Sequence, residues 1–116
     1  MIQRMNSNQR MSQIVTHNGT VYLAGQVAQT DTNADIAGQT EQILAQIESL
    51  LASVGSDKSK LLSAMIWVSD MANFQAMNQV WDQWINGENP PARACVEARL
   101  ARAELLVEIQ VVAATA

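Results

Sequence analysis

The eight-residue run Leu61–Val68, Leu-Leu-Ser-Ala-Met-Ile-Trp-Val, constrains the fold more than any other segment because it is apolar almost throughout. A continuous apolar run of this length, ended by the polar pair Ser69-Asp70, favours a strand that is buried on both faces. Amphipathic segments lie on either side of it in the sequence. We therefore expect a sheet that contains this strand, with helices packed against it.

Two segments show helical spacing of apolar residues. A helix is predicted over residues 36–54, with Asp35 as its N-cap and Gly55 as its C-terminal stop. A second is predicted over residues 72–85, and its apolar stripe is Phe74, Met77, Trp81, Trp84 and Ile85. Polar residues of the first helix are expected to face away from the core: Gln39, Gln42, Gln46, Ser49 and Ser53.

The remaining strands complete an α+β pattern. Residues 13–17 and 20–24 predict a hairpin, because Asn18-Gly19 suits a two-residue turn. Two further strands are predicted at about 94–100 and 105–113. The order ββ-α-β-α-ββ predicts a mixed sheet with both helices packed on one face. The other face then needs a cover, and symmetric self-association is the simplest one.

Composition bounds the class of protein. The 116 residues predict one domain over 1–116, with 1–11 as a flexible or divergent N-terminal segment. Hydrophobic residues make up 48% of the chain and charged residues 16%, which indicates that another subunit covers part of the surface. The net charge of −4 and the absence of a basic cluster disfavour nucleic acid and anionic membranes as partners.

The numbers of cysteine and histidine residues limit the disulfides and metal sites that the chain can form. One cysteine and one histidine leave no intrachain disulfide and no zinc site, so no metal is expected. The polar N-terminus lacks the apolar core of a signal peptide, and we expect a cytoplasmic protein. His17 adjoins the Asn-Gly turn and is interpreted as an exposed turn residue. No phosphate-binding loop and no Ser-His-Asp arrangement is visible.

Arg93 and Glu108 are the candidate functional residues. An arginine offers a planar fork of donors that matches a carboxylate, and an acid inside an apolar run is costly without a partner or a task. Alternation places Arg93 and Cys95 on one face of their strand, and places Glu108 on the sheet face away from the helices. If the two strands pair, Arg93 and Glu108 meet in a pocket for an organic acid. The alternatives are an ordinary ion pair or two solvated charges at a sheet edge, and Cys95 is interpreted as a small buried hydrophobe.

Several sequence blocks resemble the Rid (YjgF-type) enamine/imine deaminase family. Pro91-Ala-Arg93-Ala-Cys95-Val-Glu97 followed by Val107-Glu108-Ile109 resembles its C-terminal signature. Further similar blocks are Ala24-Gly25-Gln26, Val54-Gly55, Val68-Ser69-Asp70-Met71 and the segment that opens the second helix, Phe74-Gln-Ala-Met-Asn78. The resemblance covers the chain from about residue 12. It implies a chorismate-mutase-like α+β fold and a homotrimer whose sheets form a central barrel, with ligand clefts between subunits.

The same resemblance implies an activity and a site. The activity is hydrolysis of reactive 2-enamino or 2-imino acids, made by pyridoxal phosphate enzymes, to 2-keto acids and ammonia, without metal or cofactor. Arg93 would bind the substrate carboxylate, backbone groups at Cys95 and near Gly25 would contact the reacting end, and Glu108 would hold and polarise the attacking water. The partner would be a small organic acid.

The chain also departs from the best-studied deaminase subgroup. Where that subgroup has a Gly-Pro-Tyr segment before the first strand, this chain reads Gln9-Arg10-Met11-Ser12, without the tyrosine that helps to line the cleft. Leu100-Ala101 replaces a Leu-Pro pair, and the chain is more similar to the shorter YoaB-like branch. The alternative is that the protein is a trimer without catalytic activity, which binds small carboxylates or has a regulatory function. A protein-protective or RNA-cleaving role is also attributed to family members, and the acidic charge argues against RNA contact.

Overall fold

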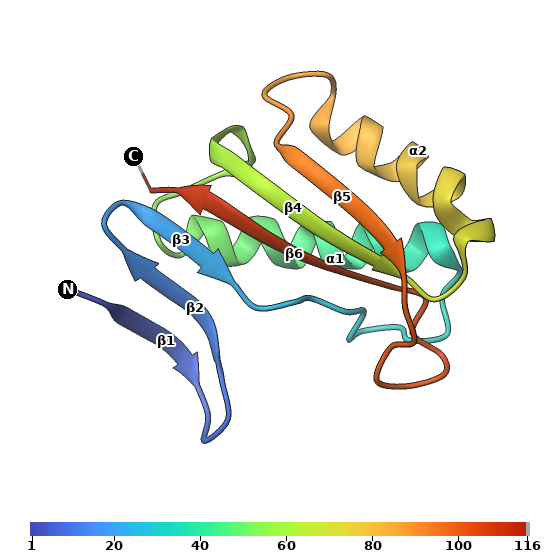
Figure 1. Cartoon of the computed structure of the whole chain (residues 1–116), viewed down its shortest axis with the longest axis horizontal. Coiled ribbons are helices and arrows are strands. Elements are labelled where there is room, and N and C mark those ends of the chain that lie inside the picture. The colour runs from blue at the N-terminus through green and yellow to red at the C-terminus, as the bar shows by residue number, and fades with distance from the viewer. Residues whose placement is uncertain (116) are drawn as a thin grey trace.

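The computed structural model describes residues 1–115. Its helices and strands follow the chain in the order β1-β2-β3-α1-β4-α2-β5-β6 (Figure 1). Their bounds are β1 Gln3–Ser7, β2 Ser12–His17, β3 Thr20–Leu23, α1 Ile36–Ala52, β4 Leu61–Val68, α2 Phe74–Ile85, β5 Ala92–Glu97 and β6 Val107–Ala114. One-turn 3₁₀ helices precede β4 and α2, at Lys58–Lys60 and Met71–Asn73. The predicted order lacked only β1.

Within residues 1–115 the strands form one mixed six-stranded sheet in the order β1-β2-β3-β6-β4-β5. Neighbouring strands are antiparallel except for β4 and β5, which are parallel. The predicted hairpin is β2–β3, where Asn18 and Gly19 both adopt positive φ. β5 forms one edge of the sheet and β1 the other. β4 separates β5 from β6, and this separation matters for the site.

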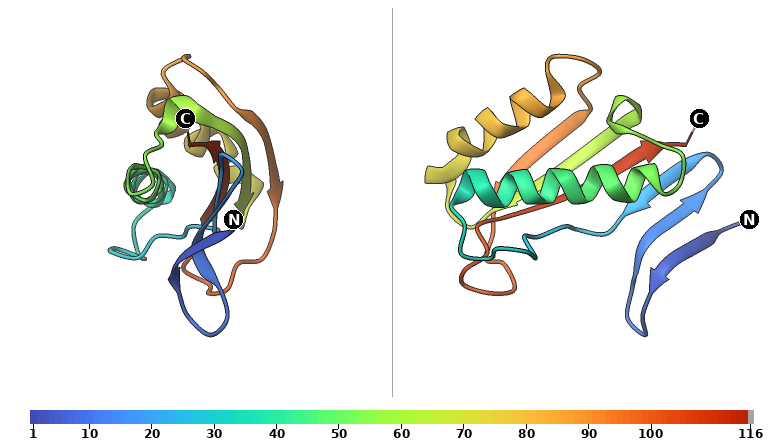
Figure 2. Two further views of the ribbon diagram at one scale, coloured as in Figure 1. Left: turned by 90° about the vertical axis from the view of Figure 1, so that its left-hand side faces the viewer. Right: turned by 180° about the vertical axis from the view of Figure 1, so that it is seen from behind.

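Both helices cover the same face of the sheet. In Figure 1 they lie behind the strands, and the right panel of Figure 2 shows them in front after the molecule is turned around. Between the helices and the sheet lies the core, in which alternate residues of β6 are buried: Val107, Ile109, Val111 and Ala113. Met77, Trp81 and Ile85 of the predicted α2 stripe are buried as well. The expected α+β architecture is therefore confirmed.

The ends of α1 follow the local sequence. Asp35 Oδ1 accepts a hydrogen bond from the Gly38 amide at 2.9 Å, which confirms the predicted N-cap. The helix ends at Ala52, and the chain turns at Gly55 with φ +76°. That left-handed conformation suits glycine, so the stop signal was read correctly although the helix is two residues shorter than predicted.

The expectation that Leu61–Val68 is buried on both faces is wrong for the single chain. Ala64, Ile66 and Val68 are buried beneath the helices, while Met65 and Trp67 on the opposite face are half-buried. The reason is that both helices lie on one face, and no other described segment covers the second. We call this second face the open face.

Gln39 also departs from expectation, because it is completely buried instead of facing away from the core. Its Nε2 lies 2.9–3.2 Å from the carbonyl oxygens of Thr32, Ala34 and Glu104, and its Oε1 accepts the Leu106 amide at 2.9 Å. A single amide side chain thus satisfies backbone groups of two loops that are far apart in sequence. Burying this amide costs little free energy because each polar atom of the side chain has a hydrogen-bond partner.

Replacing Gln39 by leucine should destabilise the protein strongly. The variant would leave buried carbonyls and one amide without partners, and we expect a loss of roughly 3 kcal/mol or more in the free energy of unfolding. Urea denaturation measures the effect. Gln42→Leu is the matched control, since Gln42 also bonds to loop backbone, at Thr30 and Asp31, but on the surface. Equal losses for the two variants would contradict the special role of Gln39.

Candidate functional site

Glu108 lies directly against Gly25, another residue that the sequence motifs singled out. A Cβ built on Gly25 would overlap Glu108 Oε2 and lie 3.0 Å from Glu108 Cδ. Gln26, the next residue, is bonded to β6 in both directions: its amide donates to the Ile109 carbonyl at 2.8 Å and its carbonyl accepts the Ile109 amide at 3.0 Å. Gly25 is thus held beside Glu108 by backbone pairing. The group that lies against the Gly25 backbone is the Glu108 carboxylate.

A chain of glutamine side chains fixes the segment that carries Gly25. Gln26 is 3% exposed, and its Nε2 donates to Gln13 Oε1 at 2.8 Å. Gln46 on α1 donates both to Gln26 Oε1 and to the Val27 carbonyl, each at 3.1 Å. Sequence analysis missed this role of Gln26 and Gln46. The sequence did contain one signal for this role, the unusual number of glutamines in the first helix. A helix that only needed polar residues at exposed positions would not require so many glutamines.

Burial raises the pKa of the Glu108 carboxyl above its ordinary value of 4.5. The residue lies on the open face, paired in register with Trp67 of β4, and flanked along β6 by the buried Val107 and Ile109. Among residues 1–115 no ion pair holds the carboxylate. The carboxyl group of Glu108 therefore holds a proton more readily than an exposed glutamate does.

Arg93 and Cys95 lie on the helix side of the edge strand β5. Arg93 pairs in register with Ala64 and Cys95 with Ile66, and both of these β4 residues are buried under the helices. The Arg93 guanidinium carbon lies 5.4 Å from the centre of the Trp81 ring on α2. Cys95 packs against the core, and burial raises the pKa of its thiol although the charge of Arg93 opposes that shift. A raised pKa leaves Cys95 a thiol at neutral pH and gives no support to a nucleophilic role.

Arg93 and Glu108 do not meet within one chain. The sequence-based pocket required their strands to pair, but β4 lies between β5 and β6. Arg93 shares a face with Ala64, and Glu108 shares a face with Trp67, three residues further along β4, so the two side chains point to opposite faces. Strand geometry puts their Cα atoms about 14 Å apart. A pocket shared by both residues within a single copy is therefore excluded.

The open face carries apolar side chains that no described segment covers. Tyr22 is 47% exposed and Val96 42%, and a hollow of about 460 Å³ lies over β4, β5 and β6. Its lining residues are Ser63, Ala64, Met65, Ala92, Arg93, Ala94, Gln110 and Val112. Exposed apolar surface of this kind is typical of a face that contacts another protein surface.

Glu108 should make stability depend on pH in a defined direction. Because its pKa is raised in the folded state, the folded protein binds this proton more tightly than the unfolded chain, and stability falls as pH rises from about 4.5 through the folded pKa. Glu108→Gln removes that loss, so the variant should gain stability relative to the parent between pH 4 and pH 8. Thermal melting across this range measures it. Glu41→Gln, at an exposed position of α1, is the control. An equal gain in stability in that variant would mean that the pH dependence does not come from Glu108.

The structure is that of a small α+β protein in which two helices pack on one face of a mixed sheet. The half-buried carboxyl group of Glu108, on the last strand, lies against the backbone of Gly25. The sequence matches the family described as Endoribonuclease L-PSP over residues 1–115. It is 41% identical to a RutC family protein of Haemophilus influenzae over 112 residues, covering 97% of each chain. It is also 41% identical over 113 residues to the RutC family protein YoaB of Escherichia coli, again covering 97% of each.

Solved structures agree with the sequence comparison. A member of the YjgF protein family from Neisseria meningitidis matches with a TM-score of 0.94 and 43% identity, covering 100% of this chain and 96% of that one. The chain belongs to the Rid (YjgF/RutC, Endoribonuclease L-PSP) family, as the motifs around Arg93 and Glu108 indicated. No helix within residues 1–115 has the length and apolar character needed to cross a membrane.

Proposed function

We propose that this protein hydrolyses reactive 2-imino acids, and their 2-enamino tautomers, to 2-keto acids and ammonia. The observation that carries the proposal is the Glu108 carboxyl, held against Gly25 and with a pKa raised by burial. A group that only had to bind a carboxylate ligand would not need an acid there, because like charges repel. Arg93, with an exposed guanidinium that no described acid pairs, supplies the complementary carboxylate-binding group.

The chemistry requires little more than placement and proton transfer. The carbon of a protonated imine is already electrophilic, so water adds to it once the water is held in position. Glu108 accepts a proton from that water as the C–O bond forms, which gives a carbinolamine, and it returns that proton to the nitrogen. As the C–N bond breaks and the C=O bond forms, the remaining hydroxyl proton passes through Glu108 to the departing ammonia, which leaves as ammonium. The products are the 2-keto acid and ammonia, with every atom supplied by the substrate and water. A positioned carboxyl group of this kind contributes ~10²–10⁴-fold in rate.

The complete site needs a second copy of the chain. Because Arg93 and Glu108 point to opposite faces of one sheet, they can act on one substrate only if Arg93 of one subunit approaches Glu108 of another. The edge position of β5 and the apolar open face are consistent with such an arrangement. We propose a homotrimer with its sites between subunits. Sedimentation of the purified protein tests this, and a folded monomer would leave the proposal without an assembled site.

The direct test is an assay with a panel of imino acids. An amino-acid oxidase generates each imino acid in place, and the rate of keto-acid formation is measured with and without the protein. We expect the protein to increase that rate for at least one member of the panel. Equal rates for all of them, by a protein that is folded and oligomeric, would exclude the deaminase and leave the non-catalytic carboxylate-binding function as the better account. That alternative retains Arg93 and has no use for Glu108.

A further inference from the structure

Arg93 rests on an aromatic platform whose geometry is fixed by contacts behind it. The guanidinium carbon is 5.4 Å from the centre of the Trp81 ring, within the range of a cation–π interaction. Trp81 is only 4% exposed, so its ring is held by the core, whereas Arg93 on the edge strand is exposed. A buried ring thus supports a charged group that is otherwise bordered by solvent.

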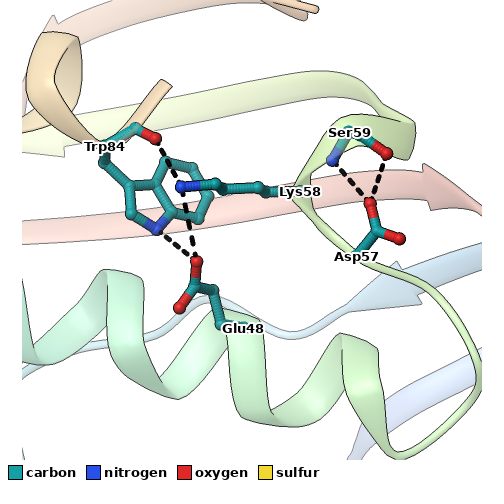
Figure 3. Close-up of polar contacts among 5 residues, drawn as sticks. All are labelled: Glu48, Asp57, Lys58, Ser59 and Trp84. Carbon is teal, nitrogen blue, oxygen red and sulfur yellow. Dashed lines mark hydrogen bonds and ion pairs between the residues drawn. The ribbon is translucent and has the colours of Figure 1, made fainter. Parts of the chain in front are cut away.

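Trp81 is in turn held by Trp84. The two ring centres are 5.5 Å apart with the planes inclined at 54°, an arrangement that aromatic pairs favour. Glu48 of α1 accepts a hydrogen bond from Trp84 Nε1 at 3.0 Å (Figure 3). Lys58 donates to the Trp84 carbonyl at 2.7 Å and lies 5.4 Å from the centre of the Trp84 ring. We call Glu48, Lys58 and Trp84 the indole clamp.

The contacts leave the hydrogen-bonding edge of Arg93 available. Cation–π contact uses the flat face of the guanidinium, while carboxylates bind to its in-plane N–H groups. Glu97, the acid that shares the Arg93 face of β5, accepts the Met71 amide at 2.8 Å and does not pair with Arg93. The residues around Arg93 therefore restrict its orientation without competing for its donors.

We propose that Trp81 is a positioning residue that presents the donors of Arg93 to the substrate carboxylate, and that the indole clamp fixes Trp81 in turn. The proposal rests on the carboxylate-binding part of the proposed function. An arginine side chain loses rotamer freedom when it binds a ligand, and a platform that orders it beforehand reduces that loss. Trp81 does not touch the reacting atoms, so its removal should weaken binding more than it slows the chemical step.

The test is the affinity for pyruvate, a 2-keto acid product, compared with pyruvamide, which lacks the carboxylate. Calorimetry or NMR titration measures both dissociation constants. Trp81→Leu should weaken pyruvate binding roughly 2- to 30-fold, the range of a cation–π contact, and change pyruvamide binding little. Trp81→Phe should fall between the parent and the leucine variant, because phenylalanine is a weaker platform than tryptophan. With imino-acid substrates the same order should appear in KM, with kcat nearly unchanged.

A variant outside the platform tests the clamp without disturbing the core. Glu48→Gln removes a charge from an exposed side chain and should weaken pyruvate binding about 2- to 3-fold through Trp84. Glu104→Gln, which alters the exposed Arg102–Glu104 ion pair in the loop before β6, is the matched control and should have no effect. Should Trp81→Leu fail to fold, the phenylalanine and Glu48 variants decide the question.

The outcomes separate this proposal from the proposed function. Loss of pyruvate binding in Arg93→Ala but not in folded Trp81→Leu would overturn the role of Trp81 and leave the carboxylate site in place. Equal weakening of pyruvate and pyruvamide in the Trp81 variants would show a merely structural role and would also overturn it. Unchanged pyruvate binding in Arg93→Ala would instead remove the carboxylate site of the proposed function, and the positioning role with it.

Discussion

Replacing Arg93 by alanine should abolish measurable deamination, with kcat/KM falling by ~10²–10⁴. Arg93 is the residue of the site motif that is proposed to bind the substrate carboxylate. Its removal takes away two charge-assisted hydrogen bonds at once. Orientation of the imine carbon against the held water is lost with them. The loss should appear in the oxidase-coupled assay at substrate concentrations well below KM.

The control for this result is Arg93→Lys. Lysine retains the positive charge but not the planar fork, so we expect partial activity, above that of alanine and well below that of the parent. Stability should change little in either variant, because Arg93 is exposed and forms no ion pair within residues 1–115. An alanine variant that deaminates at the parent rate would show that the carboxylate is bound elsewhere.

The strands and helices with strong periodic patterns were predictable, and β1 shows why one strand was not. The segment Gln-Arg-Met-Asn-Ser of β1 contains a single apolar residue, Met5, and it has neither alternation nor β-branched residues. It becomes a strand because β2 offers an unpaired edge, with Arg4 and Met5 paired to Val15 and Ile14. Pairing of this kind is a tertiary effect, which local propensity does not contain.

Of the two predicted site residues, Glu108 lies on the expected face of the sheet, whereas Arg93 lies on the opposite face and does not meet Glu108 within one chain. Alternation along β6 placed Glu108 on the face away from the helices, as observed, because one residue step along a strand reverses the direction of a side chain. The order of strands in the sheet is not local information. β4 inserts between β5 and β6, so Arg93 and Glu108 are separated although their strands are consecutive in the sequence.

The buried glutamines mark a further limit of sequence reasoning. Helical periodicity assigns a polar residue to the outer face, and Gln39 is nevertheless buried completely. Its burial depends on carbonyls of Thr32, Ala34 and Glu104, which come from two loops whose paths the sequence does not specify. The contact between Gly25 and Glu108 likewise depends on the backbone pairing of Gln26 with Ile109, which joins two segments far apart in the sequence.

Gly25→Ala should reduce the proposed deaminase activity nearly as severely as Glu108→Ala, by ~10²–10⁴ in kcat, while the protein remains folded. The added Cβ would occupy the place of Glu108 Oε2, so the carboxyl group must move away from the water it is proposed to hold. Stability should change by less than about 1 kcal/mol, because the displaced group is the end of a flexible side chain and Gly25 does not have a positive φ. Steady-state kinetics and thermal melting measure the two effects separately.

The double variant Gly25→Ala/Glu108→Ala shows whether the two residues act through the same carboxyl group. If alanine at position 25 acts only by displacing Glu108, the double variant is no slower than either single variant, and their coupling energy equals the whole effect of one. Gly38→Ala is a control for the added methyl, since Gly38 lies in α1 against Ala34 and Asp35 and not against Glu108, so it should alter stability and leave kcat unchanged. Additive losses in the double variant would mean that Gly25 contributes something other than room for the carboxylate, such as direct backbone contact with the substrate.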